Sequence, residues 1–355
     1  MLKGLDPLKL DWDWKTQGLI NAYYDDGCMP HAELTDAGYN YLQDSDLNFI
    51  DFLRSGTCSH EGLKDSFDGT YRVMKEVFDV FLTRNGLKPQ DISSSVFGLA
   101  GVDTPYQKKM IEEKVALLGF CNFKVANDSF LGLKAVGEAG VCSICGTGTS
   151  SGGIDVKGNY LQVGGIGAIV GDEAGGSWLA RRAIRQTFDS MYRFGNKSMI
   201  DDIVMNELGV TDKYYLMENI SDKLGARKVN LEKLCKAVFE CANQNDEVCI
   251  GLLKEMANNL ARSAGGCVAN LELGENPLVV LAGSVWVKGS NPTLVNEFKK
   301  LINEYTKKKC NVVILTLPPA TGAIVWALEL LEGKFPSEEI RMKISNLVSD
   351  KYKTI

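Results

Sequence analysis

The sequence predicts an α/β protein in which short buried strands alternate with amphipathic helices. Its 355 residues favour two domains over one, and its 45% of apolar residues allow a large buried core. A further observation is a recurring turn between a strand and a helix, found at Ala100–Asp103, Gly146–Thr149, Gly283–Ser284 and Pro319–Gly322. Because α/β sheets bind ligands at the carboxyl ends of their strands, these turns predict one shared ligand cleft.

The first half of the chain supplies most of the predicted strands as short apolar runs. They cover Val96–Ala100, Phe123–Ala126 and Val141–Cys145, with Gly153–Val156 as the hairpin partner of the third run. Helical patterns follow the first two strands at Tyr106–Leu118 and Phe130–Gly137, and Asp128 is the predicted cap of the second helix. This alternation is typical of an α/β fold.

The second half is predicted to be mainly helical, with two further buried strands. Helical patterns cover Asp172–Phe188, Val248–Leu273, Thr321–Leu331 and Glu338–Lys351, and a helical region from Asn196 to Gln244 is broken at Gly209 and Gly225. The two strands are Leu278–Ala282 and Val312–Leu315.

Charge and hydropathy argue against two classes of partner. The net charge is -6 and no block or stripe of Lys and Arg is present, so a nucleic-acid partner is not expected. No apolar stretch approaches the roughly 18 residues that a membrane span needs, and the N-terminal residues show no signal peptide. The sequence therefore predicts a cytoplasmic protein with no membrane partner.

The 10 cysteines lie mostly in apolar stretches, which predicts reduced, buried thiols rather than a disulfide framework. Cys142 and Cys145 form a C-x-x-C pair. This pair can be a metal or redox site, or simply two small residues on a strand. No second pair follows at zinc spacing and the chain has only 2 histidines, so the structural alternative is favoured and no metal ligands are predicted.

The segment Cys145–Gly153 (CGTGTSSGG) is a candidate phosphate-binding turn. Its glycines let the backbone approach a phosphate closely, successive N–H groups can point at the phosphate, and the hydroxyls add donors. It is not a Walker A loop, because the Gly-Lys-Ser/Thr ending is absent, and it does not open a helix as a dinucleotide motif does. On this motif alone, a purely structural turn is the alternative.

Asp103 is the candidate catalytic base. It follows Gly101 at the end of a predicted strand, where its carboxylate would face the cleft and could accept a proton from an attacking hydroxyl. The alternative is a helix N-cap in the segment Asp103–Tyr106, with Pro105 in the first turn. The two roles need not exclude each other.

The tract Gly164–Trp178 (GGIGAIVGDEAGGSW) holds six glycines, so an extended loop running into a helix is predicted. Asp172 and Glu173 would lie at the helix start, where the helix dipole favours carboxylates. Two carboxylates beside exposed backbone also suit a sugar, which offers many hydroxyls and little apolar surface. The strand in Leu278–Trp286 (LVVLAGSVW) ends at Gly283 and Ser284, where adenine or ribose could lie or a helix could simply begin.

Together these motifs resemble the N-acetylglucosamine kinases of the BadF/BadG/BcrA/BcrD group, in the superfamily of actin, hexokinase and the 70-kDa heat-shock ATPases. The resemblance covers residues 90–330. Its most specific match is Gly171–Ser190 (GDEAGGSWLARRAIRQTFDS), followed by Leu281–Trp286, while FGLAGVDTP, VANDS and ICGTGTS fall in the family's order. The resemblance implies two ribonuclease-H-like (actin-like ATPase) domains flanking a nucleotide and sugar cleft. They are expected over residues 1–118 and 119–335, with a C-terminal helix, 336–355, packing back on the first.

The resemblance also implies a site and a reaction. Asp103 matches the family's base on the sugar 6-hydroxyl, and the sugar would also meet Asn40, Gly165, Ile166, Gly167 and Asp172. Nucleotide binding is implied for Thr16, Asn127, Gly146, Thr147, Gly148, Thr149, Gly283 and Ser284, with ATP and Mg²⁺ as cofactors. The implied reaction is ATP-dependent phosphorylation of an amino sugar: N-acetylglucosamine, with N-acetylmuramic acid or glucosamine as other acceptors. Members of this group often form homodimers.

The N-terminal segment departs from the family's pattern. The family's first phosphate loop, an acidic residue followed by three glycines and a threonine, aligns with Trp12–Thr16, and Asp13–Lys15 replaces the glycines. Side chains there obstruct close approach of the backbone to a phosphate. Two further hypotheses therefore stay open. One is a catalytically impaired sugar sensor of the same fold, and the other is an activating ATPase of the same superfamily, for which Cys142 and Cys145 are the only hint.

Overall fold

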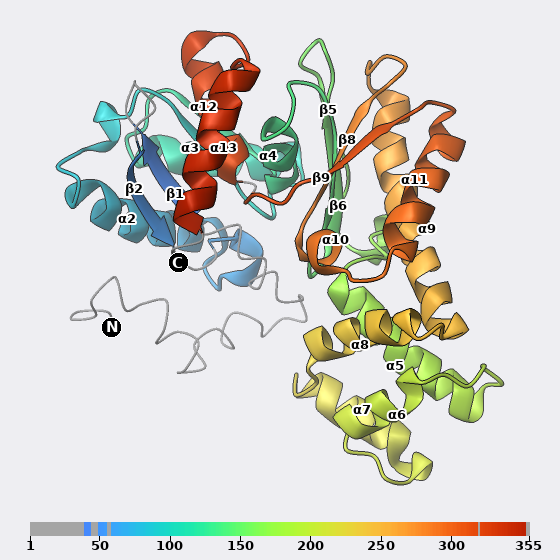
Figure 1. Ribbon diagram of the computed structural model, residues 1–355. Coiled ribbons are helices and arrows are strands. Elements are labelled where there is room, and N and C mark those ends of the chain that lie inside the picture. The colour runs from blue at the N-terminus through green and yellow to red at the C-terminus, as the bar shows by residue number, and fades with distance from the viewer. Residues whose placement is uncertain (1–38, 44–48, 55–57, 319, 353–355) are drawn as a thin grey trace.

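The computed structural model describes residues 39–43, 49–54, 58–318 and 320–352, and it confirms the α/β class (Figure 1). The strands in chain order are β1 (Tyr39–Gln43), β2 (Phe49–Arg54), β3 (Ser95–Gly98), β4 (Phe123–Ala126), β5 (Gly140–Cys145), β6 (Thr149–Ile154), β7 (Tyr160–Gly164), β8 (Leu278–Ala282) and β9 (Asn311–Ile314). The α-helices are α2 (Ser66–Thr83), α3 (Pro105–Leu117), α4 (Asp128–Lys134), α5 (Gly176–Tyr192), α6 (Ile200–Glu207), α7 (Leu216–Gly225), α8 (Leu231–Asn243), α9 (Glu247–Asn270), α10 (Ser284–Lys288), α11 (Thr293–Thr306), α12 (Ala320–Glu332) and α13 (Glu338–Tyr352).

The larger sheet lies in the second half of the chain and has the strand order β7-β6-β5-β8-β9. β5, β6 and β7 form an antiparallel meander, and β8 and β9 run parallel to β5 and to each other. This is the strand order of a ribonuclease-H-like domain. β5 is buried along its whole length and β8 after its first residue, as expected for strands covered on both faces.

Helices cover both faces of the larger sheet. α9 packs on the face that carries Val141 and Val279, and α4 packs on the face that carries Cys142 and Val280. Side chains that alternate along β5 and β8 therefore pack into two separate hydrophobic cores, one on each face of the sheet. Gly152 in β6 permits the close approach of α4, because a Cβ atom there would lie 2.4 Å from the Ser129 hydroxyl oxygen.

Before residue 127, β3 and β4 pair in parallel and carry an aromatic core. The rings of Phe78, Phe97 and Phe120 meet edge to face with centroids 5.2–5.7 Å apart. α2 and α3 pack against each other beside this pair. β4 lies after residue 118 in the chain but pairs with β3, which lies before it. The division into domains at 1–118 and 119–335 stays a prediction.

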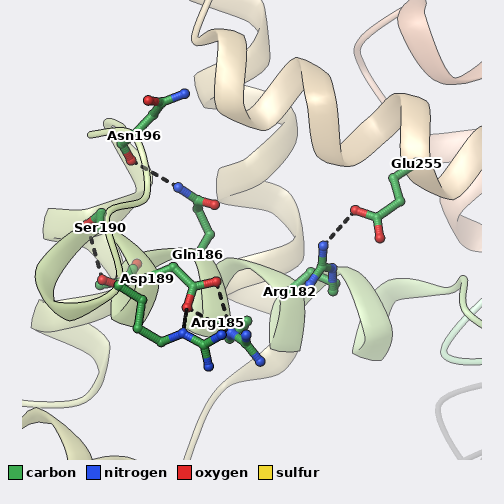
Figure 2. Close-up of polar contacts among 9 residues, drawn as sticks. Arg182, Arg185, Gln186, Asp189, Ser190, Asn196 and Glu255 are labelled. Atoms are coloured by element: carbon green, nitrogen blue, oxygen red, sulfur yellow. Dashed lines mark hydrogen bonds and ion pairs between the residues drawn. The ribbon is translucent and has the colours of Figure 1, made fainter.

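A helical segment from α5 to α9 separates β7 from β8 in the sequence, and in Figure 1 α6, α7 and α8 lie away from the sheet while α9 runs beside it. α5 buries Leu179 and Ala183 against α8, whereas its other face is polar. Figure 2 shows two contacts of that polar face. Arg182 reaches Glu255 on α9 at 2.7 Å, and the Gln186 amide donates to the backbone oxygen of Asn196 at 2.9 Å.

The last two helices join the two parts of the molecule. α12 packs on α4 and β3, and the Ser94 hydroxyl before β3 donates to the Ala327 backbone oxygen at 2.8 Å. α13 packs on α12 through Val325, Ile344 and Val348, all of which are buried. Assignment of residues 336–355 to the first domain stays a prediction.

Most predicted elements agree with the structure to within a few residues, and two predicted helix starts are wrong. The predicted helix from Asp172 begins instead at Gly176, because Gly171 and Gly175 adopt φ values of 89° and 94° that a helix cannot contain. The predicted cap Asp128 is the first residue of α4, and Asn127 is the cap. No helix in the described parts of the chain combines the length and apolarity needed to cross a membrane.

Candidate active site

The carboxylate of Asp103 is not used as a helix cap, because the next residue performs that role. The Thr104 hydroxyl accepts from the Gln107 backbone N–H at 3.2 Å, and the Gln107 side-chain oxygen accepts from the Thr104 N–H at 2.8 Å. This reciprocal capping box satisfies the start of α3. The N-cap alternative for Asp103 is therefore wrong, and its carboxylate is available for other contacts.

Two side-chain amides hold the Asp103 carboxylate. Asn127 Nδ2 donates to Asp103 Oδ1 at 3.0 Å, and Gln162 Nε2 donates to the same oxygen at 2.5 Å. Asn127 is 3% exposed, and its own Oδ1 accepts from the Ser129 backbone N–H at 3.0 Å as the N-cap of α4. The side chain predicted to contact a nucleotide is thus engaged with the candidate base.

Burial and charge both oppose ionisation of this carboxylate. The pKa of Asp103 is raised to about 7: loss of hydration is the largest cause, the hydrogen bond from Gln162 opposes it, and the negative charges of Glu61, Asp128 and Asp172 add to it. A carboxylate with a pKa near neutrality is suited to accept a proton at the pH of a cell.

The glycine-rich tract after β7 folds around Asp172. Asp172 Oδ2 accepts from the backbone N–H groups of Gly165 and Gly167 at 2.8 and 2.7 Å. Burial raises the pKa of Asp172, and these backbone hydrogen bonds lower it. The sequence placed Asp172 at the start of a helix, but the structure begins α5 at Gly176. Asp172 instead organises the loop that precedes the helix. Ile166, between the two glycines, is 54% exposed.

The candidate base lies directly against the glycine-rich tract. A Cβ atom on Gly165 would lie 2.4 Å from Asp103 Oδ1 and 2.7 Å from Gln162 Nε2, and Gly165 has a φ of 106°. Only glycine permits both this backbone conformation and this approach. The structure thus brings Asp103, Gly165, Gly167 and Asp172 together.

The strand register gathers the predicted loops at one end of the larger sheet. Ser150, next to the Gly146–Thr149 turn, pairs with Gly164 at the start of the glycine-rich tract. Ile144 pairs with Ala282, so the turn also lies beside Gly283. The carboxyl ends of β5, β7 and β8 therefore open toward the same region, the place where α/β sheets bind ligands.

The Gly146–Thr149 turn is held by the start of α5. The Gly146 N–H donates to the Gly148 backbone oxygen at 3.0 Å, and the backbone oxygens of Gly146 and Thr147 accept from the N–H groups of Gly176 and Ser177 at 2.7 and 3.1 Å. Thr149 Oγ1 donates to the Ile144 backbone oxygen at 2.8 Å.

Gly283 closes against the same turn. A Cβ atom at Gly283, whose φ is 108°, would lie 2.6 Å from the Cys145 backbone oxygen and 3.1 Å from the Gly146 nitrogen. Ser284 begins α10 directly after it. The predicted phosphate turn and the predicted adenosine motif are therefore neighbours.

The structure does not test the side chains of two predicted site residues. Thr16 lies outside the described residues. Asn40 lies in β1, where its backbone pairs with Leu53 of β2. The sequence analysis in turn missed Gln162. Its one visible signal is a polar residue in the apolar run Tyr160–Gly164, immediately before the glycine-rich tract.

Cys142 and Cys145 do not form a joint site. Both are fully buried, but Cys142 packs with the α4 side of the sheet and Cys145 with the α9 side. Residues three apart on a strand point to opposite faces, which explains the separation. Burial raises the pKa of both thiols, so neither is a ready thiolate ligand. This arrangement supports the interpretation of both as core residues.

A sheet of this order, with glycine-rich loops gathered at one end, defines the actin-like ATPase fold. Residues 58–327 match the model of the BadF/BadG/BcrA/BcrD ATPase family, and the chain belongs to that family. Membership implies the use of ATP.

Two curated relatives and one solved structure are similar over most of their length. The N-acetylmuramic acid/N-acetylglucosamine kinase of Clostridium acetobutylicum is 28% identical over 260 residues, 72% of this chain and 84% of the relative. The N-acetyl-D-glucosamine kinase of Dictyostelium discoideum is 26% identical over 269 residues, 74% and 83%. A candidate N-acetylglucosamine kinase from Chromobacterium violaceum superposes with a TM-score of 0.58 at 20% identity, covering 83% of this chain and 95% of its own. That superposition supports the shared fold.

Proposed function

We propose that the chain is an ATP-dependent kinase that phosphorylates the 6-hydroxyl of an amino sugar. N-acetylglucosamine is the proposed acceptor, with N-acetylmuramic acid or glucosamine as alternatives. The activities named for the two curated relatives and the family's use of ATP support this proposal. The observation that carries it is the contact between Asp103 and Gly165, because it unites the candidate base with the candidate sugar loop.

The sugar side is proposed to consist of Asp172, Gly165–Gly167 and Asn40. Asp172 Oδ1 is buried and has no hydrogen-bond partner among the described residues, while Oδ2 accepts two backbone N–H groups. A buried carboxylate oxygen without a donor is costly, and a sugar hydroxyl is a fitting donor for it. The exposed backbone around Ile166 suits the rest of a polar ring.

The reaction follows from these positions. Asp103 accepts the proton of the sugar hydroxyl as that oxygen attacks the γ-phosphorus of ATP, and the bond from phosphorus to the bridging oxygen of ADP breaks. Phosphoryl transfer depends chiefly on positioning and electrostatic stabilisation, so a base that is held on one oxygen and open on the other suffices. Domain closure would exclude water from the site.

The nucleotide is proposed to meet the Gly146–Thr149 turn with its phosphates and Gly283–Ser284 with its adenosine, with Thr16 and Asn127 as further contacts. Mg²⁺ is expected to arrive with the nucleotide and to neutralise the developing charge, its phosphates being the main ligands. The negative charges of Glu61, Asp128 and Asp172, which raise the pKa of Asp103, suit such a cation.

The test is sugar-dependent release of ADP in a coupled assay with N-acetylglucosamine, N-acetylmuramic acid, glucosamine and glucose. We expect turnover with the first sugar, and a product whose phosphorus-31 spectrum identifies a 6-phosphate. 6-Deoxy-N-acetylglucosamine is the matched control, because it fills the same site without an acceptor hydroxyl. Absence of sugar-dependent ADP release from folded protein would exclude the proposal.

Thermal unfolding of the same protein distinguishes the kinase from the sugar sensor, the hypothesis that the altered segment Trp12–Thr16 motivates. A sensor would be stabilised against heat by the sugar and not by Mg-ATP, because a ligand raises the melting temperature only where it binds the folded state. A kinase is stabilised by both.

A further inference from the structure

Gln162 is a polar side chain on an otherwise apolar strand. Its neighbours Leu161 and Val163 pack against the core on the α9 side of the sheet. Because side chains alternate along a strand, Gln162 points to the opposite side, where Asp103 lies. The contact joins the two predicted domains, because Asp103 belongs to residues 1–118 and Gln162 to residues 119–335.

Both hydrogens of the Gln162 amide are used. Nε2 donates to Asp103 Oδ1 at 2.5 Å and to the backbone oxygen of Gly164 at 3.1 Å. One side chain therefore ties the candidate base to the first residue of the glycine-rich tract.

The geometry on the carboxylate is one-sided. Asn127 and Gln162 both donate to Oδ1 of Asp103, and within the described residues no hydrogen bond reaches Oδ2. Two donors on one oxygen fix the plane of the carboxylate and leave the second oxygen for the acceptor hydroxyl. They also favour the ionised form, which alone can accept a proton.

We propose that Gln162 is a positioning residue for the phosphoryl transfer: it holds Asp103 in register with the sugar loop and keeps its carboxylate ready to act as a base. This inference rests on the proposed kinase function. It makes Gln162 a determinant of the rate of the chemical step and of its dependence on pH, and assigns it no part in nucleotide binding.

The surrounding charges explain why such a residue is needed. Glu61 in the 3-10 turn His60–Gly62, Asp128 on α4 and Asp172 before α5 all disfavour a negative charge on Asp103. Burial acts in the same direction, and the Gln162 hydrogen bond acts against it. Removal of that bond shifts the carboxyl toward its protonated, inactive form.

The test is Gln162→Met, which keeps an unbranched side chain and removes both N–H donors. We expect kcat to fall on the order of 10- to 100-fold, because the base loses its alignment, while KM for ATP changes less than about twofold. The acid limb of the kcat/KM profile should move to higher pH. Gln186→Met is the matched control: this amide donates only to the Asn196 backbone, on the polar face of α5 (Figure 2).

A second variant is expected to shift the pH profile in the opposite direction. Gln162→Lys offers a charged donor, so the acid limb should move to lower pH, whereas a purely structural defect would not move the two variants in opposite directions. An unchanged pH profile in Gln162→Met, with an active wild-type enzyme, would overturn the inference.

A readout without turnover separates this inference from the kinase proposal. In protein labelled with carbon-13 at the aspartate carboxyl carbons, the NMR signal that disappears in Asp103→Asn belongs to Asp103. This signal should titrate near pH 7, and its pKa should be higher in Gln162→Met. If the wild-type protein shows no kinase activity, the function fails and this titration still decides whether Gln162 controls Asp103. No upward movement would contradict the inference.

Discussion

Asn127 supports Asp103 with one end of its amide and a helix with the other. Its Nδ2 donates to Asp103 Oδ1 at 3.0 Å, and its Oδ1 accepts from the Ser129 N–H at 3.0 Å. The side chain is almost fully buried, so neither hydrogen bond competes with water. The alignment of the candidate base is thereby coupled to the start of α4, which packs on the larger sheet.

Two substitutions of Asn127 separate its contact with Asp103 from its role as the cap of α4. Asn127→Ser keeps a good N-cap but is too short to hold Asp103, whereas Asn127→Ala loses both contacts. We expect both variants to lose about 10- to 100-fold in kcat, the value of a hydrogen bond to a charged group. Only Asn127→Ala should also lose about 1 kcal/mol in the free energy of unfolding. Denaturant unfolding and ADP release measure the two effects, and full activity in Asn127→Ser would contradict the assignment.

Asp103→Asn tests the base itself. The amide is nearly the same size as the carboxyl and cannot take up a proton, so turnover should fall by at least about 100-fold. The affinity for the sugar, measured by calorimetry, should change only a few-fold, because Asp172 and the backbone of the glycine-rich tract remain. Equal turnover in this variant would remove Asp103 from the mechanism.

The rate of the wild-type enzyme should depend on the ionisation of Asp103, whose pKa burial raises to about 7. A base must be unprotonated to act, so kcat/KM should rise about tenfold per pH unit below pH 7 and level off above it. Measurement from pH 5 to pH 9 at constant ionic strength checks this. A profile that is flat down to pH 5 would show that no group with this pKa governs the step.

The same raised pKa predicts an effect on stability of the opposite sign to most carboxylates. The folded state holds the proton of Asp103 more tightly than the unfolded chain does. This carboxyl therefore lowers the free energy of unfolding progressively as the pH rises from about 4 to about 7. Asp103→Asn should therefore melt higher than the wild type at pH 8, and the difference should vanish near pH 4. Calorimetric melting temperatures at the two pH values test this prediction.

Gly165→Ala should damage the site through a steric clash. Its Cβ atom would lie 2.4 Å from Asp103 Oδ1, so the carboxylate or the loop has to move. Gly158→Ala is the matched control, because Gly158 also has a positive φ, 80°, but no heavy atom lies within 4 Å of the added Cβ. Both variants carry the backbone strain of about 1–2 kcal/mol. Only Gly165→Ala should lose activity, by about 100-fold; equal activity in the two variants would separate this contact from catalysis.

The sequence predicts well those elements whose ends are marked by local chemistry. Phe123–Ala126 and Leu278–Ala282 coincide with β4 and β8, because each is an apolar run bounded by polar or glycine residues. The start of α5 was missed because a cap rule sees the charges of Asp172 and Glu173 and not the positive φ of Gly171 and Gly175.

The candidate site was predictable only in part. The residue patterns supplied Asp103 and the glycine-rich tract as separate candidates, the resemblance to a family supported both, and the fold brings them into contact. The partner Gln162 carries no motif of its own and lies 59 residues from Asp103 along the chain. Its role depends on the direction in which a strand presents its side chain and on the approach of a second segment. Neither is written in a local pattern.

The strand order also constrains how the protein is made. β5 is flanked by β6, which follows it at once, and by β8, which the whole helical segment separates from it. At about 5–20 residues per second, the roughly 130 residues between these two strands take on the order of ten seconds to leave the ribosome. During that time the backbone N–H and C=O groups on one edge of β5 lack the partners that β8 later supplies. A chaperone that shields strand edges would therefore be expected to act on this protein before residue 278 is synthesised.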